Sequence, residues 1–173
     1  MTVFVVAYPL IGHSNGAEIK RFRQKYDQNK ADLIEAHFTL AFAITTFTYD
    51  DVLDHTRHLA KEFQPFEFLL NRLVPYSDQY SGDHMLFLCT GQGEQQLINI
   101  YNRFYEGRFM SARQIDEAFE SHMTIATTRD IDQLVSAQAA AANLTLPIYG
   151  SVSGLNVIEI LDGEISQSTH VSF

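Results

Sequence analysis

Cysteine and basic residues are scarce in this chain of 173 residues. The single cysteine, Cys89, excludes an internal disulfide, and its place in an apolar run predicts a small buried side chain in a reducing compartment. Twelve lysines and arginines stand against twenty-one acidic residues, which gives a net charge of −9. This balance argues against a function that depends on counterion release from duplex DNA, and it leaves a small or terminal phosphate as a suitable ligand.

A long apolar segment and a basic leader are also missing. Residues 2–8 form a short apolar run with no lysine or arginine before it, so we interpret them as a first strand and expect neither a signal peptide nor a membrane span. The expected location is cytoplasmic, with no membrane partner. No stretch rich in proline, glycine or serine divides the chain, and we therefore expect residues 1–173 to form a single domain of two closely packed lobes, as a monomer.

No complete set of metal ligands is visible either. His55 and His58 lie three residues apart, a spacing that could present two imidazoles to a metal on a helix. No cysteine, third histidine or suitable carboxylate set completes such a site. The glycines of Gly91-Gln92-Gly93 are not followed by Gly-Lys-Ser/Thr and are typical of a turn rather than a phosphate loop. We expect no metal and no other cofactor.

What the chain does contain is a repeated heptapeptide. Glu-Ala-His-Phe-Thr-Leu-Ala at 35–41 returns as Glu-Ser-His-Met-Thr-Ile-Ala at 120–126. In a strand, alternate side chains share a face, so each copy places an imidazole, a hydroxyl and a small alanine on one face and apolar residues on the other. The expected cleft face carries His37, Thr39 and Ala41 in the first copy and His122, Thr124 and Ala126 in the second, while Phe38, Leu40 and Phe42 share the opposite face.

The remaining patterns predict alternating strands and helices. The order strand, helix, His strand, helix, strand occurs twice, which indicates the α+β class: a duplicated, two-lobed fold in which two antiparallel sheets face a central cleft, with helices on the outside. The expected strands are 2–8, 36–46, 66–74, 84–88 and 122–128, with three short strands in 144–173 and a hairpin turn at Asp162-Gly163. The expected helices begin at Ser14 or Asn15, at Asp50 or Asp51, at Glu94 and near Asp130, and a polar, partly helical connection spans 107–121.

Side chains that could assist the histidines are less clearly assigned. Glu35 and Glu120 could hydrogen-bond an imidazole, but we favour a solvated strand end as the explanation of both. The first helix carries Lys20, Arg21, Arg23 and Lys25 beside an inward stripe of Ile19, Phe22 and Tyr26, so we expect most of these charges to be solvated, with a phosphate contact by one of them as the alternative. Candidates for a phosphate-binding arginine are Arg72, Arg103, Arg113 and Arg129, and candidates for base stacking are Tyr8 and Tyr149.

The two motifs resemble those of the two-histidine (2H) phosphoesterases, also known as the 2′,5′ RNA ligase-like superfamily. His37-Phe38-Thr39-Leu40 and His122-Met123-Thr124-Ile125 both fit the His-x-Thr/Ser-hydrophobic pattern of that family, and the order of elements fits over nearly the whole chain. Many relatives have proline directly before the histidine, whereas this chain has Ala36 and Ser121. The resemblance implies a two-lobed fold and catalytic roles for His37, Thr39, His122 and Thr124.

The chemistry of the four residues agrees with this implication. Cleavage of a phosphodiester needs a base for the attacking oxygen and an acid for the departing oxygen, and two imidazoles can fill both roles without a metal. Threonine hydroxyls can donate to the nonbridging oxygens. Together with the resemblance, this predicts a metal-independent phosphodiesterase that hydrolyses 2′,3′-cyclic nucleotide phosphates or 2′,5′-linked oligonucleotides, with reverse 2′,5′ RNA ligation conceivable. The near-symmetric motifs do not assign base and acid.

Two other classes of function remain open. A nucleotide-binding module of the same fold could use the histidines as phosphate ligands without turnover. A structural or interaction protein could keep the repeats as relics of duplication. For the enzyme and for the binding module alike, the expected partner is a small nucleotide or an RNA-terminal phosphodiester.

Overall fold

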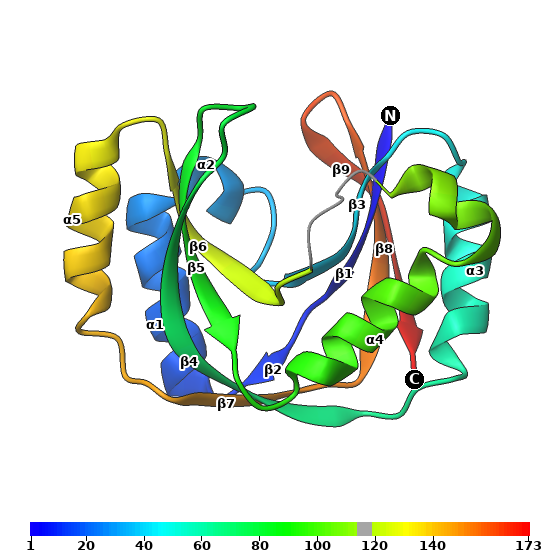
Figure 1. The fold of residues 1–173 in the computed structure, drawn as a ribbon, viewed down its shortest axis with the longest axis horizontal. Coiled ribbons are helices and arrows are strands. Elements are labelled where there is room, and N and C mark those ends of the chain that lie inside the picture. Colours follow the sequence, from blue (N-terminus) through cyan, green and yellow to red (C-terminus); the bar gives the residue numbers. More distant parts are fainter. Residues whose placement is uncertain (114–118) are drawn as a thin grey trace.

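The computed structural model describes residues 1–113 and 119–173, which form two antiparallel β-sheets covered by helices (Figure 1). The four-stranded sheet has the order β3 (Phe38–Ile44), β1 (Thr2–Ala7), β8 (Gly154–Leu161), β9 (Glu164–Ser172). The five-stranded sheet has the order β2 (Leu10–Ile11), β7 (Ile148–Val152), β4 (Phe66–Ser77), β5 (His84–Thr90), β6 (His122–Thr128). The α+β class with two antiparallel sheets is confirmed.

Each sheet draws strands from both halves of the chain. The N-terminal strands β1 and β3 pair with the C-terminal hairpin β8–β9, while β4 pairs with both β5 and β7. The helices are exchanged in the same way, since α1 (His13–Tyr26) packs on β6 of the five-stranded sheet and α4 (Glu94–Phe104) packs on β3 of the four-stranded sheet. The two halves of the sequence are therefore interleaved in the fold.

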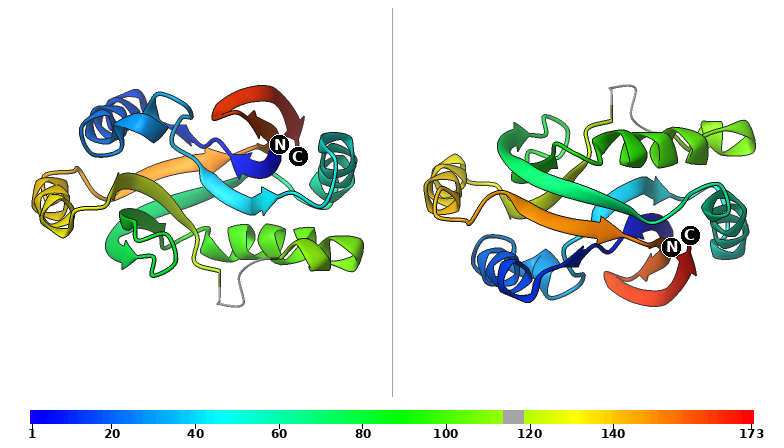
Figure 2. Two further views of the ribbon diagram at one scale, coloured as in Figure 1. Left: turned by 90° about the horizontal axis from the view of Figure 1, so that it is seen from above. Right: turned by 90° about the horizontal axis from the view of Figure 1, so that it is seen from below.

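The other helices complete two opposite layers. In Figure 2, α1 and α5 (Ile131–Ala141) lie at one end of the molecule, and α3 (Tyr49–Ala60) and α4 lie at the other, with the sheets between them. A short helix α2 (Gln28–Ala31) follows α1, and a 3₁₀ helix spans Gly107–Ala112. Part of the expected connection 107–121 lies outside the described residues. Within the described ranges, no helix has both the length and the apolar character needed to cross a bilayer.

Local sequence signals account for the ends of several elements. Thr48 begins α3 with a reciprocal capping box to Asp51, and the Asp130 carboxylate caps α5 by accepting from the backbone N–H of Asp132. The first helix differs from expectation, because its N-cap is Gly12 without a side-chain hydrogen bond, and Ser14 lies inside the helix. The hairpin turn at Asp162-Gly163 is confirmed, with both residues at positive φ as a type I′ turn requires.

Both histidine strands contain an irregular register. Strand β3 holds one residue more than β1 at two places: between Thr39 and Ala41, which pair with Val6 and Val5, and between Ala41 and Ile44, which pair with Val5 and Val3. Ala43, in the second of these bulges, has a φ of 40°. In β6, a similar shift lies between Thr124 and Ala126, where the partner β5 advances by only one residue. A bulge of this kind turns the following side chains to the other face of the strand. The simple alternation predicted from the sequence therefore fails beyond Thr39 and Thr124.

Candidate active site

A pocket of about 450 Å³ opens where β3 approaches β6, and all four motif residues line it. His37 directly precedes β3 and Thr39 is its second residue, while His122 begins β6 and Thr124 lies two residues later. The two heptapeptides, 85 residues apart in sequence, thus present two imidazoles and two hydroxyls to one space. The two motifs therefore face one cleft, as the sequence predicted.

Both imidazoles are held by the same backbone contact. Nδ1 of His37 lies 2.7 Å from the carbonyl oxygen of Glu35, and Nδ1 of His122 lies 2.8 Å from that of Glu120. A carbonyl oxygen only accepts, so Nδ1 must carry the proton in each ring and Nε2 is the nitrogen with a free lone pair when the ring is neutral. The glutamates therefore fix the tautomer through their backbone carbonyls, and not through their carboxylates, which the sequence offered only as an alternative.

Aromatic rings fix the planes of the imidazoles. His122 stacks on Phe87 with centroids 3.7 Å apart and an interplanar angle of 16°, and Tyr76 stacks on the other side of Phe87 at 5.2 Å. The ring of Tyr8 meets His37 edge-on, with centroids 6.1 Å apart. Tyr8 is thus a neighbour of the first histidine, while the second candidate for base stacking, Tyr149, is exposed on a different part of the surface.

The charges around the two histidines differ. Burial lowers the pKa of His37 to about 4, and the positive charges of Arg23 and Lys30 act in the same direction. Burial also lowers the pKa of His122, but there the Glu120 carbonyl and carboxylate oppose the shift. A proton shared by the pair is therefore better placed on His122 than on His37.

Among the described residues, Arg23 is the arginine that lines this pocket, although the sequence placed it among mostly solvated charges. Its side chain is 5% exposed, donates to the carboxylate of Asp27 at 3.2 and 3.3 Å and donates to the carbonyl oxygen of Ile34 at 2.9 Å. A signal for this burial exists in the sequence, because Arg23 falls on the helical stripe of Ile19, Phe22 and Tyr26 and has a carboxylate four residues later. The helix buries an ion pair at the edge of the pocket.

The four arginines proposed from the sequence do not line this pocket. Arg72 lies at the border of the pocket, 3.2 Å from the carboxylate of the lining residue Glu120. Arg113 lies over the ring of Tyr101, which is also a lining residue. Arg103 pairs with Glu62 and Glu106, and Arg129 pairs with Asp83.

Two expectations about the pocket walls are wrong. Phe42 lines the pocket with His37 and Thr39, although simple alternation assigned it to the opposite face, and Ala41 is buried in the core. Ala126 lines a neighbouring pocket rather than the floor of this one. The bulges in β3 and β6 account for both differences. As a result, the wall beside the motif residues is aromatic, formed by Phe42, Tyr76, Phe87, Tyr101 and Phe119.

The residue before the second histidine has a structural explanation. Ser121 is fully buried and its hydroxyl hydrogen-bonds the hydroxyl of Thr90, next to the pairing of Cys89 with His122. Proline at this position would lack that hydroxyl. Cys89 itself is buried, as the sequence predicted, and burial raises the pKa of its thiol to about 12, so it is no candidate nucleophile.

Comparisons with solved structures agree with this architecture. The chain is similar to Kluyveromyces marxianus Usb1, with a TM-score of 0.61 and 12% identity over 99% of this chain and 98% of that one. It is also similar to E. coli LigT complexed with NADP+, with a TM-score of 0.56 and 16% identity over 99% and 94% of the two chains. At such identities the likeness shows the fold alone.

The sequence itself carries the family assignment. No curated protein matches the chain significantly. A family model described as the 2′-5′ RNA ligase superfamily matches residues 12–164, which include both histidine motifs and all but the ends of the chain. The chain therefore belongs to the 2′-5′ RNA ligase superfamily of 2H phosphoesterases.

Proposed function

We propose that this protein is a metal-independent phosphodiesterase that hydrolyses 2′,3′-cyclic nucleotide phosphates or 2′,5′-linked oligonucleotides. The observation that carries the proposal is the pair of imidazoles in one pocket, each with Nδ1 bound to a backbone carbonyl and each accompanied by a threonine. This arrangement leaves both Nε2 atoms for proton transfer to or from a substrate. Membership of a phosphoesterase superfamily supports the reaction class.

The asymmetry of charge supports one assignment of the two roles. His37, beside Arg23 and Lys30, is the neutral ring, and its Nε2 accepts a proton from the attacking water. His122, beside Glu120, is the protonated ring, and its Nε2–H donates to the departing ribose oxygen. As the bond from the water oxygen to phosphorus forms and the bond from phosphorus to the ribose oxygen breaks, one proton enters the pair at His37 and one leaves it at His122. A proton transfer between the rings then restores the initial state.

The other pocket residues serve the phosphate and the base. The hydroxyls of Thr39 and Thr124 donate to the nonbridging oxygens, where negative charge concentrates in the transition state. Lys30 and Arg23 add positive potential on the His37 side. The aromatic wall offers flat faces for a nucleobase, with Tyr76 and Phe119 as members. Usb1 with uridine monophosphate and LigT with 3′-AMP are structures of this fold with nucleotides, which supports a nucleotide as the ligand here.

A binding module without turnover is the second candidate, and one observation favours it. Burial lowers the pKa of both histidines, so a free protein at neutral pH holds few protonated rings and hence little of the required acid. A bound phosphate would raise both pKa values and restore the acid. Turnover therefore decides between the two candidates.

The test is hydrolysis of the 2′,3′-cyclic nucleoside monophosphates and of a 2′,5′-linked adenylate dinucleotide, with EDTA present. The proposal predicts turnover of at least one substrate, unaffected by EDTA. The substrate that is hydrolysed fastest identifies the preferred linkage. Complete inactivity toward all of them, combined with measurable binding of the same compounds, would replace the enzyme by the binding module. Activity that EDTA abolishes would overturn the metal-independent mechanism.

A further inference from the structure

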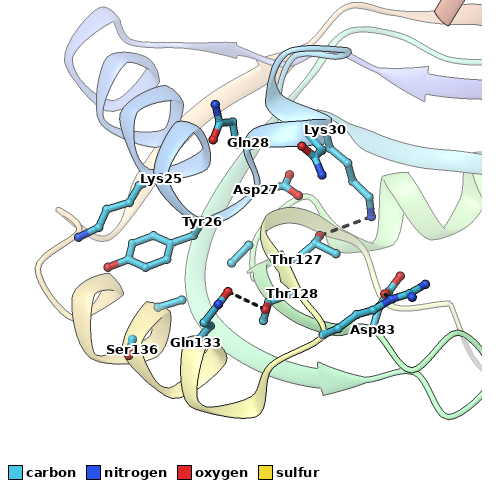
Figure 3. Close-up of a pocket in the computed structure, with 14 residues that line it drawn as sticks. Lys25, Tyr26, Asp27, Gln28, Lys30, Asp83, Thr127, Thr128, Gln133 and Ser136 are labelled. Atoms are coloured by element: carbon cyan, nitrogen blue, oxygen red, sulfur yellow. Dashed lines mark hydrogen bonds and ion pairs between the residues drawn. The ribbon is translucent and has the colours of Figure 1, made fainter. Parts of the chain in front are cut away.

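The two sides of the histidine pocket differ in chemistry. Toward α1 and α2 the lining carries charged side chains, of which Lys30 also lines a neighbouring pocket of about 630 Å³. Figure 3 shows Lys30 on this side, where its Nζ donates to Oγ1 of Thr127 at 3.4 Å. Toward α4 the lining is aromatic and includes Phe42, Tyr101 and Phe119. A phosphate therefore suits the first side and a nucleobase the second.

The three rings on the α4 side pack as one cluster. Phe119 lies flat on Tyr101, with centroids 4.2 Å apart and an interplanar angle of 6°. The ring of Phe42 meets both edge-on, with its centroid 6.4 Å from Phe119 and 6.5 Å from Tyr101. Tyr101 is buried, whereas Phe42 and Phe119 are half-buried, so these two rings offer the surface that a base could contact. A movement of Phe42 would change the shape of that surface.

Phe42 reaches the pocket because β3 is irregular on both sides of Ala41. It lies between the registered pairs of Ala41 and Ile44 with β1, and the next residue, Ala43, has a φ of 40°. A positive φ is costly for a residue with a Cβ and persists only where the surrounding structure holds it. The direction of the Phe42 ring therefore depends on contacts that hold this backbone.

One such contact comes from the end of α4. The hydroxyl oxygen of Tyr105 accepts from the backbone N–H of Phe42 at 2.9 Å. Tyr105 directly follows α4 and is buried, and its ring packs edge-on against Tyr101 and Phe104, with centroids 5.0 and 5.2 Å away. Burial raises the pKa of Tyr105 to about 12, so its hydroxyl is neutral. Tyr105 itself does not line the histidine pocket.

We propose that Tyr105 is a positioning residue for base binding, because its hydroxyl holds the segment of β3 that directs the Phe42 ring into the histidine pocket. Without this acceptor the N–H of Phe42 loses its partner, and the bulge is free to relax toward regular pairing with β1, which turns the ring away from the pocket. This inference rests on the proposed function for the ligand, and it adds a residue that sets the affinity for the base from outside the pocket.

The test compares the dissociation constants of 3′-AMP, 3′-UMP and inorganic phosphate for the wild type, Tyr105→Phe and the control Tyr49→Phe. Tyr49 is also buried, and its hydroxyl donates to Oγ1 of Thr169 at 2.8 Å, away from the pocket. Each variant removes one tyrosine hydroxyl and keeps the ring. Phe42→Ala and the combined variant of Phe42→Ala with Tyr105→Phe complete a double-mutant cycle. Thermal unfolding checks the fold of every variant.

We expect Tyr105→Phe to weaken the binding of both nucleotides about three- to tenfold and to leave the affinity for phosphate unchanged, while Tyr49→Phe changes neither. With Phe42→Ala already present, Tyr105→Phe should cause no further loss, because the ring that it positions is gone. The KM of the cyclic substrates should rise by the same factor in Tyr105→Phe, with kcat nearly unchanged.

Three results would overturn the inference while turnover by the wild type upheld the proposed function: wild-type nucleotide affinity in Tyr105→Phe, an equal loss of affinity for phosphate, or additive losses in the cycle. A wild type that binds phosphate but neither nucleotide would also overturn it, since no base contact then exists. If turnover fails for every substrate, the proposed function fails, and the nucleotide affinities still decide the role of Tyr105.

Discussion

The imidazole of His122 lies flat on the ring of Phe87, with centroids 3.7 Å apart, while its Nδ1 is bound to the Glu120 carbonyl at 2.8 Å. These two contacts fix the plane of the ring and its rotation within that plane. Nε2 therefore has one direction available when the ring is neutral or protonated. In the proposed mechanism this preorganises the acid before the substrate binds.

Replacing Phe87 by leucine should separate orientation from chemistry. We expect kcat to fall about tenfold, because His122 loses the aromatic ring that holds its plane. We also expect the alkaline limb of the pH profile to move to higher pH, because a less desolvated imidazole has a higher pKa. Tyr76→Leu is the comparison for kcat, since it removes the outer ring of the stack and leaves Phe87 on His122, while its loss of a face for the nucleobase should raise KM. Thermal unfolding checks the fold of both variants, and equal kcat values in the two would show that the contact between Phe87 and His122 has no role in catalysis.

The pH profile of kcat/KM reports the free protein and should be bell-shaped with its maximum below pH 6.5. Activity requires neutral His37, whose pKa is lowered to about 4, so it falls as the pH drops through that value. It also requires protonated His122, whose pKa lies below the ordinary 6.5, so it falls as the pH rises through that lower value. An optimum well above pH 7 would contradict this assignment of charges.

Glu120→Gln should shift only the alkaline limb. The Glu120 carboxylate raises the pKa of His122, so its removal lowers that pKa and moves the limb to lower pH. Glu35→Gln is the equivalent change before His37 and keeps the backbone carbonyl that binds Nδ1. Because the Glu35 carboxylate is not among the main causes of the lowered pKa of His37, we expect the profile of this variant to stay close to that of the wild type. A shift of the acidic limb in Glu120→Gln would reverse the roles of the histidines.

The threonine hydroxyls can be tested by shape-conserving changes. Thr39→Val and Thr124→Val keep the branched side chain but lose the donor, and each should lower kcat by about 10²-fold if the hydroxyl serves the transition state. Thr39→Ser and Thr124→Ser keep the hydroxyl and should restore most of the activity. If valine and serine variants behave alike, packing rather than hydrogen bonding explains the threonines.

The buried pair Arg23–Asp27 allows stability and phosphate affinity to be measured apart. Arg23→Met alone leaves the Asp27 carboxyl buried without its partner and should lower the free energy of unfolding by about 3–5 kcal/mol. Adding Asp27→Leu should recover most of that loss, since an apolar pair of similar volume replaces the ion pair. The stable double variant should still show a raised KM and an acidic limb shifted to higher pH, because Arg23 no longer lowers the pKa of His37. A stable double variant with wild-type KM and pH profile would make the pair purely structural.

The sequence predicts the local features of this site well. The His-x-Thr alternation needs only the two-residue period of a strand, and the turn at Asp162-Gly163 needs only its own residues. The burial of Arg23 could have been predicted from its helical position beside Ile19 and Phe22, although its partner Asp27 lies just after the end of the helix. The direction of the Phe42 side chain could not be predicted, because it depends on bulges that form where β3 pairs with β1. The exchange of strands between the halves depends likewise on partners distant in sequence, which local patterns do not specify.

The most direct test of the account is a double-mutant comparison of His37→Ala, His122→Ala and the combined variant on the best substrate of the panel, with His58→Ala as control. His58 is on α3, outside the pocket, with Nδ1 bound to the Asp54 carbonyl. If the two imidazoles act as base and acid in one transition state, each single variant should lose about 10²–10⁴ in kcat, and the combined variant should lose far less than the product of the two. Wild-type turnover in either single variant, with the fold intact, would contradict the two-histidine mechanism.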